Sequence, residues 1–121
     1  MSVRVLYVDD EDDIREIAAM SLELDPGLAV RDCASGAEAV EIAAAWKPRL
    51  ILLDVMMPGM DGPATLAALR ERPETADTPV AFITARTQRD DLDRLMALGA
   101  CGVIAKPFDP MTLAERVRAL L

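Results

Sequence analysis

The chain has 121 residues, of which 52% are hydrophobic and 28% are charged, as is typical of one compact domain, here expected to span residues 1–121. Its 13 basic residues are outnumbered by 21 acidic residues, and the formal net charge of −8 argues against direct binding to nucleic acid or to anionic membranes. Histidine is absent, which excludes an imidazole base and any metal site built on histidine.

Short apolar runs alternate with helical patterns along the whole chain. The runs predict strands over residues 3–8, 28–32, 50–53, 80–84 and 103–105, with a helix after each strand. The run at 50–53 is apolar without alternation, as expected for a strand buried on both faces. This order predicts a doubly wound (βα)5 domain of the α/β class, with a parallel five-stranded sheet between two layers of helices.

Several residues predict where helices begin and end. Ser35 and Glu38 have the spacing of a capping box that opens a helix reaching Trp46. Gly99 stands where the end of a helix favours a residue with left-handed backbone geometry. Asp109 is followed by proline, and we expect it to be the N-cap of the last helix.

Polar side chains stand at the carboxyl ends of the predicted strands. Asp9 and Asp10 follow the first strand, Asp54 follows the third, Thr84 ends the fourth and Lys106 follows the fifth. The carboxyl ends of parallel strands share one edge of the sheet, and ligands of doubly wound folds bind at that edge. We therefore expect three carboxylates, a hydroxyl and an ammonium group to converge there.

This set of groups indicates phosphoryl transfer. Neighbouring carboxylates repel one another unless a cation joins them, and oxygen ligands favour Mg²⁺ or Mn²⁺. The side chains of Thr84 and Lys106 could bind the oxygens of a phosphoryl group transferred to an aspartate, which would become an aspartyl phosphate. Taken alone, the acidic run at 9–13 fits the first turn of a helix equally well.

Four motifs together resemble the receiver domain of two-component response regulators, of the single-domain type found among chemotaxis regulators. They cover the chain in the order and spacing of that family: VDDE at 8–11, LLDVMMPGMDG at 52–62, ITA at 83–85 and KPF at 106–108. The resemblance implies a flavodoxin-like sheet with the strand order 2-1-3-4-5, and a cis peptide bond before Pro107.

The resemblance also implies a role for each site residue. Asp54 would be the phosphoacceptor, and Thr84 and Lys106 would contact the phosphoryl oxygens. A magnesium ion would be bound by the carboxylates of Asp9, Asp10 and Asp54 and by the backbone carbonyl of Met56. The donor would be a histidine kinase or a histidine phosphotransfer protein. The chain would not be an enzyme, although it would assist its own phosphorylation and dephosphorylation.

The family's switch implies a surface for a downstream protein. Phosphate on the acceptor would draw Thr84 inward and alter a face made by the fourth helix, the fifth strand and the fifth helix. Val103 stands where receivers commonly carry Phe or Tyr, so we expect the signal to pass through residues 84–85 and the fourth helix. In family members, residues at the positions of Met56 and Arg86 influence dephosphorylation.

Two other functions fit parts of the pattern. A phosphohydrolase with an aspartate nucleophile needs a second acid two residues later, where this chain has Met56. A receiver fragment of a larger regulator or of a hybrid kinase would carry the same motifs, although Met1 slightly favours a protein that stands alone.

The cysteines and the lack of long apolar stretches bear on location. Cys33 and Cys101 lack a C-x-x-C spacing and are expected to be small buried side chains in a reducing compartment. No run of about 20 apolar residues is present, so we expect a cytoplasmic protein.

Overall fold

The computed structural model describes residues 2–121, in which strands and helices alternate regularly. The elements are β1 (Val3–Val8), α1 (Asp12–Glu23), β2 (Leu28–Cys33), α2 (Gly36–Trp46), β3 (Leu50–Asp54), α3 (Gly62–Glu71), β4 (Val80–Thr84), α4 (Arg89–Ala97), β5 (Gly102–Ala105) and α5 (Leu113–Ala119). The predicted strands are all present, and three of them are longer by one residue at one end.

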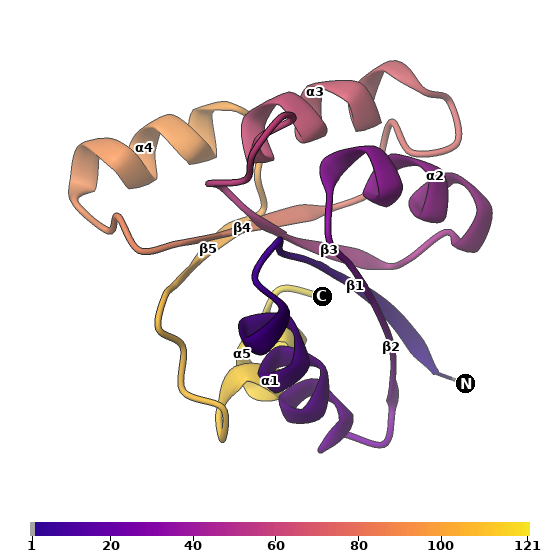
Figure 1. Ribbon diagram of the computed structural model, residues 1–121, viewed down its shortest axis with the longest axis vertical. Helices are drawn as coiled ribbons and strands as arrows, with labels where there is room; N and C mark the ends of the chain where they lie inside the picture. Colours follow the sequence, from indigo (N-terminus) through magenta and orange to yellow (C-terminus); the bar gives the residue numbers. More distant parts are fainter. Residues whose placement is uncertain (1) are drawn as a thin grey trace.

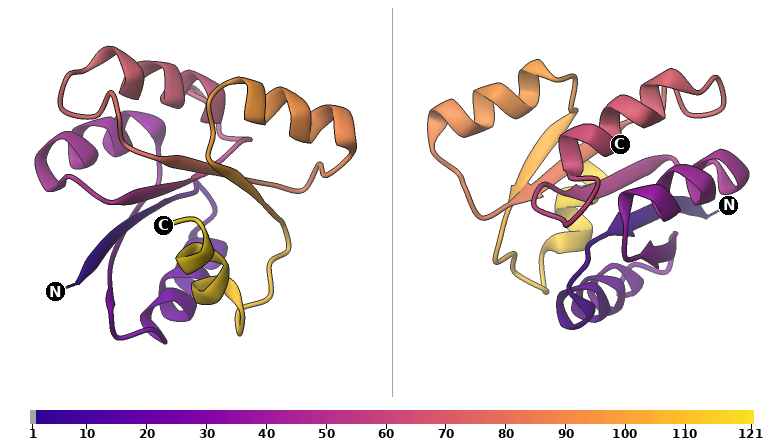
Figure 2. Two further views of the ribbon diagram at one scale, coloured as in Figure 1. Left: turned by 180° about the vertical axis from the view of Figure 1, so that it is seen from behind. Right: turned by 45° about the horizontal axis from the view of Figure 1, so that its top comes forward.

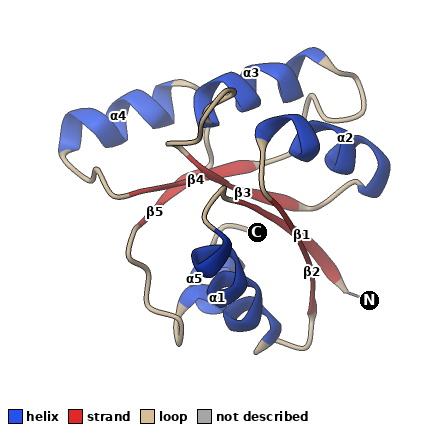
Figure 3. Cartoon of the chain, in the orientation of Figure 1, coloured by secondary structure: helices blue, strands red, loops and turns tan. Residues whose placement is uncertain are grey.

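The strands form one parallel sheet with the order β2-β1-β3-β4-β5, which confirms the strand order implied by the sequence (Figure 3). Every residue of β3 and of β4 is buried, which confirms the expectation for the apolar run at 50–53. The order reverses between β1 and β3, because the chain runs outward from β1 to β2 and then from β3 towards the opposite edge. A crevice at such a switch point is where doubly wound folds bind ligands.

Helices cover both faces of the sheet. In Figure 1, α1 and α5 lie on one face and α2, α3 and α4 lie on the other; the view from behind in Figure 2 shows the same two layers. Each layer encloses a core of buried apolar residues. Tyr7 and Leu22 belong to the core beneath α1 and α5, whereas Phe82 and Leu69 belong to the core on the opposite face.

The ends of two helices agree with the predictions. Ser35 is the N-cap of α2, and its hydroxyl accepts a hydrogen bond from the backbone N–H of Glu38 at 3.2 Å. The Glu38 carboxylate reaches back to the N–H of Ala34 at 3.0 Å, one residue earlier than in the standard capping box. Gly99 follows α4 with a φ of 104°, a backbone geometry that glycine adopts without steric cost.

The predicted start of the last helix is wrong. The helix α5 begins at Leu113 with Thr112 as its N-cap, whereas Asp109 opens a separate turn. The Asp109 carboxylate accepts from the N–H of Met111 at 2.9 Å, and the Asp109 carbonyl accepts from the N–H of Thr112 at 3.1 Å. An aspartate that bonds to the backbone two residues ahead stabilises a turn in competition with a helix.

The two cysteines differ in environment. Cys33 is buried as expected, and burial raises the pKa of its thiol to about 11. Cys101 is exposed, so the prediction that both are buried is wrong for this residue. It precedes β5 at the end of the edge strand, where one side of the chain has no neighbouring strand. Within residues 2–121, no helix has the length and apolar character needed to span a membrane.

Candidate functional site

Three aspartates meet at the neighbouring ends of β1 and β3. Asp54 is the last residue of β3, and Asp9 and Asp10 directly follow β1. These strands are paired, so their ends lie side by side at one edge of the sheet. One carboxylate oxygen from each aspartate lies within 4.8 Å of the others. The structure therefore brings together the carboxylates that the sequence assigned to a common edge.

The ammonium group of Lys106 lies among these acids. Its Nζ is 3.0 Å from Oδ2 of Asp9, 3.5 Å from Oδ1 of Asp54 and 3.6 Å from Oε1 of Glu11. Lys106 directly follows β5, and its backbone N–H donates to the carbonyl of Thr84 at 2.8 Å. The peptide bond between Lys106 and Pro107 is cis, as the resemblance implied.

The charges around Lys106 keep it protonated. Burial opposes its charged form, but the carboxylates of Asp9 and Asp54 outweigh burial, and the pKa of Lys106 is raised above its usual value. The ammonium group is therefore a positive charge at neutral pH, in contact with the carboxylates of Asp9 and Asp54.

Asp54 is buried, with 4% of its surface exposed. Burial and, second, the negative charge of Asp9 raise the pKa of Asp54 to about 6, although Lys106 acts in the opposite direction. The positive charge of one lysine thus does not fully offset burial and repulsion at this carboxyl. A further cation would favour the ionised form of Asp54.

Asp9 is completely buried and is held by neighbours that sequence reasoning did not identify. The phenol of Tyr7 donates to its Oδ2 at 3.1 Å, and the N–H of Glu11 donates to its Oδ1 at 3.0 Å. Burial and the charge of Asp9 raise the pKa of Tyr7, so the phenol keeps its proton at neutral pH. Side chains two residues apart in a strand share a face, and this spacing was the available signal.

Thr84 ends β4 at the same edge. It is buried, and its hydroxyl oxygen accepts a hydrogen bond from the backbone N–H of Arg86 at 3.0 Å. A cleft of about 210 Å³ extends from Thr84 to α4, and its other lining residues are Val55, Met56, Asp61, Pro63, Arg86, Asp91, Arg94 and Leu95. The cleft therefore connects the end of β4 with Asp91, Arg94 and Leu95 of α4.

The acidic run after β1 has two structural roles. Asp9 and Asp10 belong to the carboxylate cluster, whereas Asp12 and Asp13 lie in the first turn of α1. Negative side chains at a helix N-terminus are stabilised by the helix dipole. The helix interpretation is therefore confirmed for Asp12 and Asp13, whereas a metal site at Asp9 and Asp10 stays a prediction.

Comparison with known proteins identifies the same family from the whole sequence. The family model described as the response regulator receiver domain matches residues 5–118. The transcriptional regulatory protein YvrH of Bacillus subtilis is 42% identical over 119 residues, which cover 97% of this chain and 48% of that protein. The DNA-binding dual master transcriptional regulator RpaA of a Synechocystis strain is 36% identical over 118 residues, 98% of this chain and 48% of that protein.

Solved structures agree with the sequence matches. The chemotaxis response regulator CheY4 of Vibrio cholerae superposes with a TM-score of 0.90 and 33% identity, covering all of both chains. The receiver domain of the Francisella response regulator 1452 has a TM-score of 0.87 and 27% identity, covering 98% of this chain and 96% of that chain.

These relatives differ in length. The chain spans about half the length of YvrH and RpaA, but the full length of CheY4. The name of RpaA includes DNA binding, so the comparisons do not support the expectation that the protein makes no contact with nucleic acid. The match over residues 5–118, the strand order and the position of the three aspartates agree with one another, and the chain belongs to the receiver domain family of two-component response regulators.

Proposed function

We propose that Asp54 accepts a phosphoryl group from a phosphohistidine of a histidine kinase or a histidine phosphotransfer protein. A carboxylate oxygen of Asp54 forms a bond to phosphorus while the bond between phosphorus and the histidine nitrogen breaks. The leaving imidazole keeps the electron pair and takes up a proton. Since this chain has no histidine, the phosphohistidine is on the partner.

The observation that carries the proposal is the position of Lys106. Its ammonium group, 3.5 Å from the Asp54 carboxylate, can neutralise charge on a phosphoryl group attached there. Thr84 complements it from the end of the neighbouring strand. Its hydroxyl oxygen is already an acceptor for the N–H of Arg86, which leaves the hydroxyl proton free to be donated to a phosphoryl oxygen.

The carboxylate cluster fits a divalent cation. Its donors are all oxygen atoms, they come within 4.8 Å of one another, and burial and, second, the charge of Asp9 raise the pKa of Asp54, so a bound cation would stabilise its ionised form. We assign Mg²⁺, or Mn²⁺ in its place, to Asp9, Asp10, Asp54 and the backbone carbonyl of Met56. When bound, the ion supplies positive charge beside the oxygens of the transferred group.

Intact mass spectrometry after incubation with acetyl phosphate and Mg²⁺ tests the acceptor. We expect the wild-type chain to gain one phosphoryl mass and Asp54→Asn to gain none. Asp90→Asn is a matched control, because Asp90 is an exposed acid in the first turn of α4 and should leave the gain unchanged. No gain on the wild type, or an equal gain on Asp54→Asn, would refute the assignment.

We regard the chain as a phosphoacceptor that assists its own phosphorylation and dephosphorylation, through Lys106 and Thr84, and not as an enzyme for other substrates. A phosphohydrolase would need an acid at position 56, where Met56 has 68% of its surface exposed to solvent. Met56 and Arg86 lie beside Thr84 on the same cleft, a position from which they can affect the access of water.

The output surface is inferred from the cleft that runs from Thr84 to α4. An inward movement of Thr84 would change the packing at this cleft, and so the face formed by α4, β5 and α5, which would bind a downstream protein. Val103 is paired with Phe82 of β4 and offers no aromatic ring to rotate, which leaves the loop after Thr84 as the route. With a phosphoryl mimic bound, NMR shifts should extend into α4; shifts confined to the surroundings of Asp54 would contradict this route.

The protein is assigned to the cytoplasm, in line with its membership of the receiver domain family. Relatives of about twice its length support the alternative that the sequence is the receiver part of a longer regulator, while the match to CheY4 covers all of both chains. In either case we expect the receiver itself to contact proteins, because its formal net charge is −8.

A further inference from the structure

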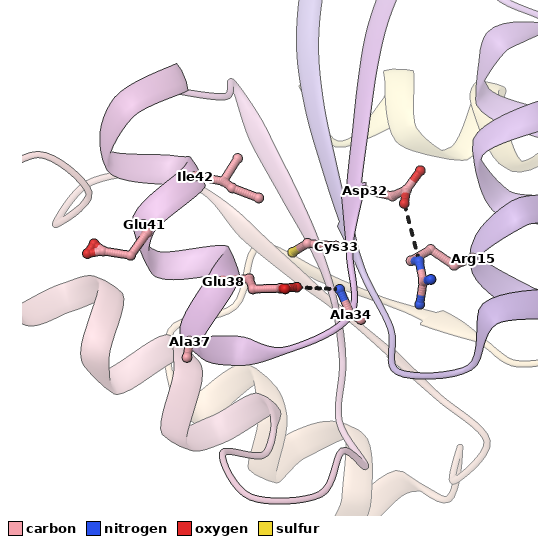
Figure 4. A pocket seen from close by; sticks show the side chains of 8 residues that line it. All are labelled: Arg15, Asp32, Cys33, Ala34, Ala37, Glu38, Glu41 and Ile42. Carbon is pink, nitrogen blue, oxygen red and sulfur yellow. Dashed lines mark hydrogen bonds and ion pairs between the residues drawn. The ribbon is translucent and has the colours of Figure 1, made fainter.

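The guanidinium group of Arg15 joins three parts of the acidic edge. Its Nη1 donates to the backbone carbonyl of Asp9 at 2.9 Å, its Nη2 contacts Oδ1 of Asp12 at 2.6 Å, and its Nε lies 3.2 Å from Oδ1 of Asp32. Figure 4 shows the ion pair with Asp32 from close by. Only 18% of the Arg15 side chain is exposed, so its planar donors are held in place by these partners.

The contact with Asp9 acts on the segment that carries two of the three clustered aspartates. Residues 9–11 leave β1 and turn into α1, and the Asp9 carbonyl is the point where Arg15 holds this segment. A second tie is the hydrogen bond from the Asp9 N–H to the carbonyl of Cys33 at 3.1 Å. Both ties lead to β2, because Asp32, the other partner of Arg15, precedes Cys33 in that strand.

An open cleft lies on the outer side of Arg15. It measures about 670 Å³ and is lined by Arg15, Asp32, Cys33, Ala34, Ala37, Glu38, Glu41 and Ile42 (Figure 4). Side chains from α2 line the wall of this cleft opposite Arg15. On this side of the segment, the Asp9 carbonyl accepts its hydrogen bond from Arg15.

We propose that Arg15 is a positioning residue for the metal site, which holds the Asp9 carbonyl and thereby presets the carboxylates of Asp9 and Asp10 for Mg²⁺. The inference rests on the proposed metal site. Electrostatics alone predicts the opposite effect, because a positive charge near the acids weakens the binding of another cation. Positioning predicts that loss of the arginine weakens Mg²⁺ binding, whereas simple charge removal predicts that it strengthens binding.

Isothermal titration with Mg²⁺ alone tests positioning with a variant that retains the positive charge, for which simple electrostatics predicts an unchanged Kd. Arg15→Lys keeps the charge but loses the planar set of donors, and we expect its Kd for Mg²⁺ to rise by about tenfold, as is usual for residues that orient metal ligands. Arg72→Lys is the matched control, because Arg72 also pairs with two acids, Glu41 and Glu74, but does not contact the site. Its Kd should equal that of the wild type.

A second variant guards against a fold defect in Arg15→Lys. Asp32→Asn leaves Arg15 in place but removes one of its anchors, and its Kd should rise by a smaller factor. Unfolding midpoints without Mg²⁺ are measured for every variant, since a purely structural role would lower the midpoint without changing the Kd of the folded protein. A Kd for Arg15→Lys equal to or below the wild-type value would overturn the inference.

Failure of the metal site itself has a different signature. Asp10→Asn should abolish Mg²⁺ binding if the proposed site is correct. If Asp10→Asn abolishes binding and Arg15→Lys does not change it, only the role of Arg15 fails. If the wild type gives no Mg²⁺ binding, the metal assignment fails and the inference fails with it.

Discussion

At the scale of single residues, the buried carboxyl of Asp54 lowers the stability of the folded protein. Its pKa is about 6 in the folded protein against 3.8 for the ordinary carboxyl, chiefly because of burial and then because of Asp9. A carboxyl whose pKa is raised by folding binds more protons in the folded state than in the unfolded state. Its destabilising effect on the folded protein therefore grows as pH rises from 3.8 to 6, and it reaches its full size above pH 6.

Asp54→Asn should therefore stabilise the protein in Mg²⁺-free buffer. We expect the free energy of unfolding at pH 7 to increase by about 2 kcal/mol, and the gain to disappear as pH falls through the range from 6 to 3.8. Urea unfolding of both proteins at several pH values measures the difference. A gain that does not depend on pH would show that the ionised carboxylate is not its cause.

Tyr7 makes the opposite contribution, because its phenol stabilises a buried charge. Tyr7→Phe keeps the ring and removes the hydroxyl that donates to Asp9. We expect a loss of about 1–2 kcal/mol in the free energy of unfolding, since a hydrogen bond to a buried carboxylate is lost without a replacement. In a double-mutant cycle with Asp9→Asn, the two changes should be non-additive. Additive effects would mean that the hydroxyl acts elsewhere.

The site residues that were predicted from the sequence are placed by the topology of the sheet, whereas those that were missed are placed by side-chain packing. Asp9, Asp54 and Lys106 could be placed together because strand ends of a parallel sheet share an edge. The spacing of Tyr7 and Asp9 indicates only that the two side chains share a face, and no spacing rule specifies the contacts of Arg15. Tyr7 has the sequence context of a core aromatic and Arg15 that of a solvated helix residue, and only packed side chains show which polar atom each one meets.

At the scale of elements, the start of α3 is packed unusually closely against the end of β3. A Cβ atom at Gly62 would lie 2.7 Å from the carbonyl oxygen of Asp54 and 2.8 Å from the Cα of Val55. Both are backbone atoms, which cannot move aside as a flexible side chain can. The Gly62 N–H also donates to the Val55 carbonyl at 2.9 Å, which holds the helix at this distance.

Gly62→Ala should push α3 away from β3 and displace the backbone of the phosphoacceptor. We expect a loss of about 1–3 kcal/mol in the free energy of unfolding, the usual cost of forcing an extra carbon into packed structure. Slower phosphorylation by acetyl phosphate should accompany it. Gly59→Ala is the comparison, because a Cβ there meets no atom within 4 Å and only the φ of +74° is strained. Unchanged phosphorylation of Gly62→Ala would contradict the proposed displacement.

Element boundaries show where sequence patterns are insufficient. The capping box of α2 was predicted because two side chains at fixed spacing satisfy backbone groups locally. Asp109 has the same chemistry as an N-cap, but its carboxylate closes a turn ahead of α5. An aspartate followed by proline satisfies the requirements of both structures, and the packing of Leu113 and Val117 against the sheet selects the later start.

At the scale of the whole molecule, the acidic edge belongs to a protein with a net charge of −8. Added salt of any kind should stabilise such a chain by screening its self-repulsion. A cation bound specifically by the three clustered aspartates should add a separate contribution, because it binds the folded chain, in which these carboxylates are gathered, and not the unfolded chain. Screening and specific binding differ in how they depend on the salt concentration and in whether they require the three clustered aspartates.

Mg²⁺ should therefore raise the unfolding midpoint more than NaCl of equal ionic strength does, and EDTA should reverse the difference. At a concentration ten times the Kd, specific binding contributes about 1.4 kcal/mol to the free energy of unfolding. Asp10→Asn should lose this specific part while it keeps the response to NaCl, since one charge in a total of −8 changes the overall repulsion little. Thermal unfolding of the two proteins in matched salts is the measurement. Equal stabilisation by Mg²⁺ and NaCl in the wild type would show that the cluster of Asp9, Asp10 and Asp54 contributes only to the general field of the protein and binds no ion.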